Sequence, residues 1–183
     1  KTLILVEKFN LAFNFAENIK SDKELLFEAD LVLGLKFFLE KDFENAEKTF
    51  LKLNKISRYN LYFNNFIGNV LIAWTKASQG KKNQSFKFIE KIPQNYRHLT
   101  KIQSAFLKCF YDDHQTQESF EELIKEKDYN FSRYNFFLAN HLIYENKKNE
   151  AQKVIQNSMK ENSSNLLLKQ AKTFLIENRE DKI

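Results

Sequence analysis

A recurring interval between small residues constrains the fold of this chain more than any other feature. Within residues 31–53, Phe37 stands three residues after Gly34. Twelve residues after the glycine comes Ala46, which is followed four residues later by Phe50. Apolar residues three or four apart share one face of a helix. A small residue on each of two helices lets the backbones approach closely, while large residues one turn away fill the surrounding space. The stretch therefore predicts two adjacent amphipathic helices.

These intervals resemble the tetratricopeptide (TPR) repeat, whose consensus runs W-x2-L-G-x2-Y, then A-x3-F, then P. Two positions depart from that consensus, because Asp30 stands in place of the Trp and Arg58 in place of the Pro. A related all-α array, of the SEL1-like or HAT-like kind, therefore stays open. The resemblance, which extends to divergent bacterial TPR-like proteins, implies an all-α fold. Its expected form is a right-handed α-solenoid of TPR-like helical hairpins.

The same interval recurs along the chain. Further small residues expected at contacts between paired helices are Ala73 with Ser85, and Ala139 with Ala151. In the third pair, the residue twelve after Ala105 is Gln117, which is out of phase. Only three Gly and one Pro occur among 183 residues, which favours long helices joined by short turns. We predict a single helical-repeat domain, 1–183, made of a partial repeat (1–20), helix pairs (22–54, 57–92, 95–127 and 131–160) and a closing helix (164–178).

Turn and cap residues support these boundaries. Residues 21–24, Ser-Asp-Lys-Glu, form a capping box that begins the first complete pair. A turn at Lys41 leads to Asp42, whose side chain is expected to cap the second helix. One long helix is expected from Ser57 to Gln79, ending near Gly80, and a further turn at residues 146–147.

The first residues of the chain echo a later motif. The pattern Glu-Lys-Phe-x2-Ala at residues 7–12 is similar to Lys-Asp-Phe-x2-Ala at residues 41–46, at the TPR period of 34 residues. The small residue that opens such a repeat would lie before Lys1. We therefore expect the chain to be part of a longer array.

Residues that could support catalysis or metal binding are scattered. His98, His114 and His141 belong to different predicted elements, and none has a partner at metal-ligand spacing on one helix. Cys109 with residues 112–114 is the one local group that a metal would accept, but a helix end followed by an acidic loop is a simpler interpretation. No Gly-rich phosphate loop, G-x-S-x-G or H-E-x-x-H motif occurs. We expect no enzyme activity, catalytic residue, metal site or cofactor.

The net charge is +5, but basic residues alternate with acidic ones, as in the Glu-Lys-Asp run at 40–42. A nucleic-acid footprint would gather the basic residues on one face, so an RNA-binding helical repeat is the less favoured alternative. Apolar runs such as residues 3–6 are too short to span a bilayer, so no membrane span is expected. No signal-peptide pattern is found, and the compartment, cytoplasmic or bacterial periplasmic, stays open.

By the resemblance, the first helix of each pair lines a concave face that contacts a partner. The residues expected there are Leu35, Phe38, Trp74, Phe106, Phe110, Phe136, Asn140 and Tyr144. Such a face suits an amphipathic helix or an apolar peptide. It does not suit a terminal carboxylate, because the best repeat has Leu31 and Leu35 where carboxylate-clamping arrays have Lys and Asn. We predict a protein–protein interaction scaffold whose protein or peptide partner is unidentified; a structural spacer without its own ligand is the alternative.

Overall fold

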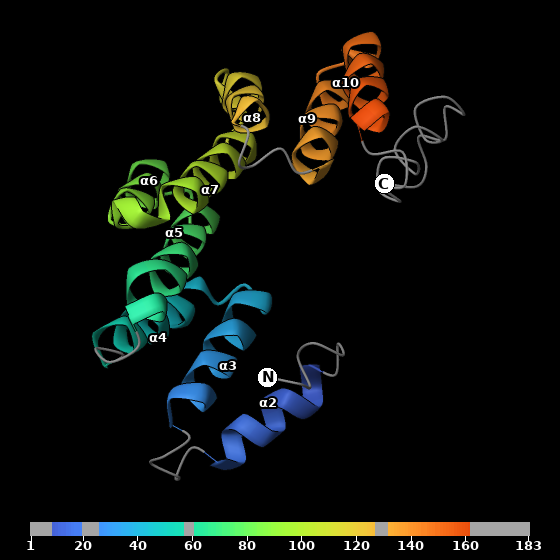
Figure 1. The fold of residues 1–183 in the computed structure, drawn as a ribbon. Helices are drawn as coiled ribbons and strands as arrows, with labels where there is room; N and C mark the ends of the chain where they lie inside the picture. Colours follow the sequence, from blue (N-terminus) through green and yellow to red (C-terminus); the bar gives the residue numbers. More distant parts are fainter. Residues whose placement is uncertain (1–8, 20–25, 57–60, 127–131, 162–183) are drawn as a thin grey trace. The chain divides into compact units, whose positions relative to one another are not determined.

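The computed structural model describes residues 9–19, 26–56, 61–126 and 132–161, and all regular structure in these ranges is helical (Figure 1). The elements are α2 (Phe9–Asn18), α3 (Leu26–Leu39), α4 (Phe43–Ile56), the π-helical turn η2 (Phe63–Ile67), α5 (Gly68–Ser78), α6 (Lys82–Glu90), the 3-10 turn η3 (Gln94–Tyr96), α7 (Arg97–Phe110), α8 (Thr116–Lys125), α9 (Ser132–Tyr144) and α10 (Lys148–Glu161). The predicted all-α class is confirmed. The capping box at 21–24 and the closing helix at 164–178 lie outside the described residues.

The chain divides into two compact units, Lys1–Thr100 (unit 1) and Lys101–Ile183 (unit 2), with the boundary inside α7. In unit 1, each α-helix from α2 to α5 packs against the next one along the chain. In unit 2, α9 packs against both α8 and α10. Packing between helices that are neighbours in sequence is typical of repeat proteins.

Four helices of the described ranges end in the same kind of turn. The residues with left-handed backbone in these turns are Lys41 (φ 63°), Gly80 (φ 74°), Asp112 (φ 49°) and Asn146 (φ 62°). In the first turn the N–H of Asp42 donates to the Phe37 carbonyl (2.8 Å), and the N–H of Lys41 donates to the Phe38 carbonyl (3.1 Å). Equivalent pairs form in the other three turns, and this Schellman arrangement satisfies carbonyls at the helix C-terminus. The turns expected at residues 41, 80 and 146 are confirmed.

The core of unit 1 forms where α3 approaches α4 at the predicted small residue. Gly34 and Ala46 are both buried, and Phe50 is fully buried with Leu53 in the same cluster. A Cβ atom on Gly34 would lie 2.5 Å from Cε1 of Phe50, which is far inside van der Waals contact. The side chain of Asp42 accepts a hydrogen bond from the N–H of Asn45 (3.2 Å) and so caps α4 as expected.

A largely buried ion pair joins α4 to α5. Nζ of Lys76 lies 2.6 Å from Oε1 of Glu47, and the two side chains are only 11% and 18% exposed. Burial raises the pKa of the Glu47 carboxyl, but hydrogen bonds from Lys76 and Gln79, together with the Lys76 charge, outweigh it and leave the pKa lowered. The amide of Gln79 also donates to the carbonyl of Phe43 (3.1 Å). This contact ties the end of α5 to the start of α4.

The long helix expected over residues 57–79 contains an irregularity that its apolar pattern does not reveal. Its described part, from residue 61, passes through the π-helical turn η2, in which the N–H of Gly68 donates to the carbonyl of Phe63. The side-chain amide of Asn69 donates to the carbonyls of Asn64 (3.1 Å) and Asn65 (3.3 Å). A π-turn leaves backbone carbonyls without their usual partners, and the Asn69 amide donates hydrogen bonds to two such carbonyls.

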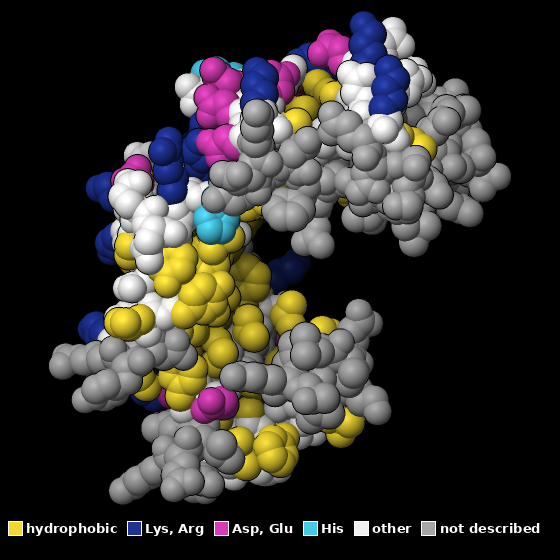
Figure 2. Space-filling view, in the orientation of Figure 1, with side chains coloured by type: hydrophobic (Ala, Val, Ile, Leu, Met, Phe, Trp, Pro, Cys, Tyr) yellow, Lys and Arg dark blue, Asp and Glu magenta, His cyan; other side chains and the backbone are white. Residues whose placement is uncertain are grey.

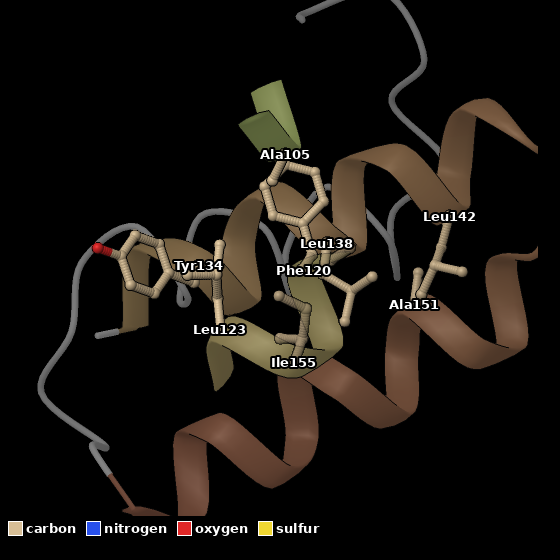
Figure 3. Packing of buried hydrophobic residues seen from close by; sticks show 9 residues of the cluster. Ala105, Phe120, Leu123, Tyr134, Leu138, Leu142, Ala151 and Ile155 are labelled. Carbon is tan, nitrogen blue, oxygen red and sulfur yellow. The ribbon is translucent and has the colours of Figure 1, made fainter. Parts of the chain in front are cut away.

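The core of unit 2 gathers buried side chains from four helices. The cluster contains Ala105 from α7, Phe120 and Leu123 from α8, four side chains from α9 and two from α10, and Figure 3 shows them packed together. Ala105, Ala139 and Ala151 are all buried, as their spacing predicts.

The close-contact position of α8 is Thr116, one residue before the Gln117 that the twelve-residue spacing marks. Thr116 is fully buried, and Phe120 follows it by four residues, just as Phe50 follows Ala46. The N–H of Thr116 donates to Asp113 three residues back, whereas the N–H of Ala46 donates to Asp42 four residues back. A tighter first turn uses one residue fewer, which accounts for the burial of Thr116 one position before Gln117.

Candidate functional site

Four of the eight residues predicted for a partner-binding face lie together in unit 2. Phe106, Phe110, Asn140 and Tyr144 line a groove of about 480 Å³ between the C-terminal parts of α7 and α9. We call this the α7–α9 groove. Its remaining lining residues are Cys109, Asp112, Phe120, Phe137 and His141.

Aromatic rings packed edge to face build the floor of the α7–α9 groove. Phe106 meets Phe120 edge-on at a centroid distance of 5.7 Å, and it meets Phe137 edge-on at 4.7 Å. Edge-to-face pairs at these separations are favourable beyond the area that they bury. The fully buried Phe120 anchors this arrangement to the core of unit 2. The floor is therefore a preformed apolar surface.

The rim of the groove carries two aromatic side chains that the core does not cover. Phe110 is 51% exposed and Tyr144 is 71% exposed. Asn140 adds a half-buried amide, which can both donate and accept a hydrogen bond. Apolar walls with a few polar groups are typical of sites that bind a ligand and fix its orientation.

Carboxylates dominate the electrostatics of the C-terminal end of the groove. Burial raises the pKa of the Cys109 thiol, and the negative charges of Asp112 and Glu145 raise it further. The Glu145 carboxyl is negatively charged at neutral pH, and a hydrogen bond from Lys147 (2.6 Å) holds its pKa below the usual range. The buried imidazole of His141 lies 3.3 Å from the same carboxyl group. Cys109 is thus a poorly activated thiol and an unsuitable nucleophile.

The local group of Cys109 and residues 112–114 does not converge. Cys109 and Asp112 line the groove, whereas His114 is exposed and lies 3.6 Å from Asp113. Across the described ranges, no three His, Cys, Asp or Glu side chains are grouped so that they could hold a metal ion. None of the helices in those ranges has the length and apolarity that crossing a bilayer requires.

The other four predicted residues are placed differently. Leu35 and Phe38 are half-buried and pack against the core of unit 1, where the ring of Phe38 lies 5.5 Å from that of Phe43. Trp74 is half-buried in unit 1. Phe136 packs against the core of unit 2, while its neighbour Phe137 lines the groove.

A signal for the missed groove residues exists in the sequence. Residues 137, 140, 141 and 144 are spaced as one face of a helix, and so are residues 106, 109 and 110. The expected set included Phe136, which lies on a neighbouring face of α9. Choosing between adjacent faces requires knowing which helices cover α9, and that information is tertiary.

An aromatic cluster in unit 1 was not anticipated. The ring of Tyr96 lies 5.9 Å from that of Tyr62 and 6.0 Å from that of Phe66. Leu61 and Tyr62 are exposed beside the π-turn. Figure 2 shows hydrophobic side chains gathered over the part of unit 1 where η2 and α5 lie.

Comparison with known proteins does not assign the groove to a family. No protein-family model matches the chain, and no curated protein or solved structure matches it either.

Proposed function

We propose that this chain is a TPR-like α-solenoid that acts as a protein–protein interaction scaffold, with the α7–α9 groove as a binding site for a peptide or a partner helix. The repeated Schellman turns and the buried small residues support the repeat architecture. The main support for a binding role is that two exposed aromatic side chains, Phe110 and Tyr144, stand at the rim of a groove with a preformed aromatic floor. Large aromatic side chains at the edge of an apolar groove are the residues that most often anchor protein interfaces.

The bound segment would place apolar side chains on the aromatic floor. An amphipathic helix presents such anchors at intervals of three or four residues, and an extended peptide presents them at every second residue. A spacer without a ligand has no need of exposed aromatic side chains beside a groove of about 480 Å³. The spacer alternative therefore predicts that changes at the rim leave every binding property unchanged.

Peptide selection against the whole chain tests the proposal. A displayed library of random 16-residue peptides would be selected on the wild-type protein, and the enriched peptides would be measured by calorimetry. We expect the double variant Phe110→Ala/Tyr144→Ala to lose roughly tenfold or more in affinity, since each interface anchor contributes about 1–2 kcal/mol or more. The matched control is Phe15→Ala, which removes a 58% exposed ring from α2 of unit 1.

Cys109 provides an independent readout because it is the only cysteine in the chain and it lines the groove. A bound peptide should slow alkylation of this thiol. Peptides that bind the wild type and the double variant equally, and that leave alkylation unchanged, would contradict the proposed site.

A further inference from the structure

The C-terminal end of the α7–α9 groove carries an exposed carboxylate. Asp112 lines the groove, and within the described part of the chain its carboxylate makes no hydrogen bond or ion pair. By contrast, nearby basic side chains are engaged: Lys147 pairs with Glu145 at 2.6 Å, and Lys108 donates to the hydroxyl of Ser119 at 2.9 Å. The negative charge of Asp112 is therefore available to a ligand.

Two helix ends add to this negative charge. Cys109 and Phe110 from the last turn of α7, and His141 and Tyr144 from the last turn of α9, line the groove. The carbonyl groups at a helix C-terminus carry a partial negative charge, which favours a cation nearby. The effect of Asp112 and Glu145 on the thiol of Cys109 is consistent with this field.

The rim side chains suit a cation as well as an apolar group. Phe110 and Tyr144 are exposed aromatic rings in the same groove as Asp112. The face of an aromatic ring attracts Lys and Arg side chains, whose aliphatic portions also pack well on apolar surfaces.

We infer that the ligand of the α7–α9 groove is a peptide segment in which a Lys or Arg stands beside an apolar anchor, with the cation meeting Asp112 and the rings of Phe110 and Tyr144. This inference rests on the proposed binding function and specifies the chemistry of the partner. The apolar anchor occupies the aromatic floor, and the cation occupies the C-terminal end. An acidic peptide or a nucleic-acid backbone would instead bring negative charge against Asp112.

The variant Asp112→Asn isolates the charge. Asp112 has a φ of 49°, and Asn adopts this left-handed conformation at least as readily as Asp does. The substitution keeps the shape of the side chain, so the Schellman turn should be retained. Glu118→Gln is the matched control, since it removes one negative charge from the exposed face of α8 in the same unit. Far-UV circular dichroism of each variant verifies the helical content.

The experiment begins with the library peptides whose binding requires Phe110 and Tyr144. We expect Lys or Arg to be enriched next to the apolar anchor in those peptides. The consensus peptide would then be synthesised with an acetylated N-terminus, once with arginine and once with neutral citrulline at that position. Acetylation ensures that the side chain is the only source of the positive charge under test.

Affinities of the two peptides for the wild type and both variants decide the inference. Citrulline should weaken binding to the wild type and to Glu118→Gln roughly three- to tenfold, as expected for a partly exposed charge pair beside aromatic rings. The same replacement should have little effect on binding to Asp112→Asn. Raising the salt concentration should weaken the arginine peptide more than the citrulline peptide.

The possible failures are distinguishable. Groove-dependent peptides with neutral or acidic residues beside the anchor would overturn the charge assignment and leave the binding function standing. If the ratio of the arginine-peptide affinity to the citrulline-peptide affinity is equal for the wild type and Asp112→Asn, the charge assignment is likewise overturned. If no selected peptide depends on Phe110 and Tyr144, the proposed function and this inference are both refuted.

Discussion

Replacing Gly34 with alanine tests the closest helix–helix contact in unit 1. The new Cβ would lie 2.5 Å from Cε1 of Phe50, whereas ordinary van der Waals contact begins at 3.4 Å. Phe50 is fully buried in the core cluster, so its ring has no solvent to move into. The two helices must therefore separate, or the core must rearrange, by nearly an ångström.

Two opposing effects set the magnitude of the change. Overpacking of a core costs about 1–3 kcal/mol, and the severity of this overlap favours the upper part of that range. Alanine recovers about 1 kcal/mol because it is a better helix former than glycine. The net expectation for Gly34→Ala is a destabilisation of about 1–2 kcal/mol. With a urea slope of about 1–2 kcal/mol/M, the unfolding midpoint should fall by roughly 1 M.

Fluorescence of the single tryptophan, Trp74, reports on unit 1 and provides the assay. Urea titrations of Gly34→Ala would be paired with titrations of Phe50→Leu and of the double variant. In the Phe50→Leu background the alanine should be neutral or slightly stabilising, because the atom that it overlaps has been removed. A higher midpoint for Gly34→Ala in the wild-type background would refute the close approach of α3 and α4.

Three further predictions concern the Glu47–Lys76 ion pair, the Cys109 thiol and two positions with left-handed backbone. Glu47→Gln should destabilise unit 1 by about 1–3 kcal/mol at pH 7, because it leaves Lys76 largely buried without its partner. Folding lowers the pKa of the Glu47 carboxyl, so its stabilising contribution is present above the unfolded pKa and disappears as pH falls through the folded pKa. The urea midpoints of the variant and the wild type should therefore converge as the pH falls below the folded pKa. Because burial raises the pKa of the Cys109 thiol, this thiol should alkylate more slowly at pH 8 than it does in the unfolded chain. The contribution of the neutral thiol to stability is present below the unfolded pKa and is lost as pH rises through the folded pKa. Calorimetric melting between pH 8 and 10 would detect this loss. Gly80→Ala should lower the free energy of unfolding of unit 1 by about 1 kcal/mol through its φ of 74° alone, since a Cβ there has no neighbour within 4 Å. Lys41→Gly, at a φ of 63°, should raise it by a similar amount, and urea titration measures both changes.

Local patterns in the sequence are sufficient to predict the helices and many of their contacts. Gly34, Ala46 and Ala73 are buried where their spacing places them, because only small residues can be accommodated where two helix backbones approach closely. The π-turn of η2 has no comparable signal. It depends on hydrogen bonds that Gly68 and Asn69 make to carbonyls in the preceding turn, and an Asn at this position in a sequence does not by itself indicate such bonds.

The candidate site was predictable only in part. The resemblance to TPR repeats implied Phe106, Phe110, Asn140 and Tyr144 as partner-binding residues, and all four line the groove. Periodicity does not distinguish the face that neighbouring helices cover from the adjacent face that they leave open, and Phe136 illustrates this limit. In α3 the expected Leu35 and Phe38 are half-buried against the core of their own unit, and the same apolar pattern is compatible with both outcomes.

In the Schellman turns, the backbone requires a residue that tolerates positive φ, but it does not determine the charge of that residue. The left-handed position that ends α3, α5, α7 and α9 needs only a residue that tolerates positive φ, and it is occupied by Lys41, Gly80, Asp112 and Asn146. Fold stability therefore leaves the charge of this position free to vary. Of these four residues, Asp112 lines the α7–α9 groove. At Asp112 that freedom places a carboxylate beside an apolar groove, and the charge can be removed by substitution with Asn while the turn is retained.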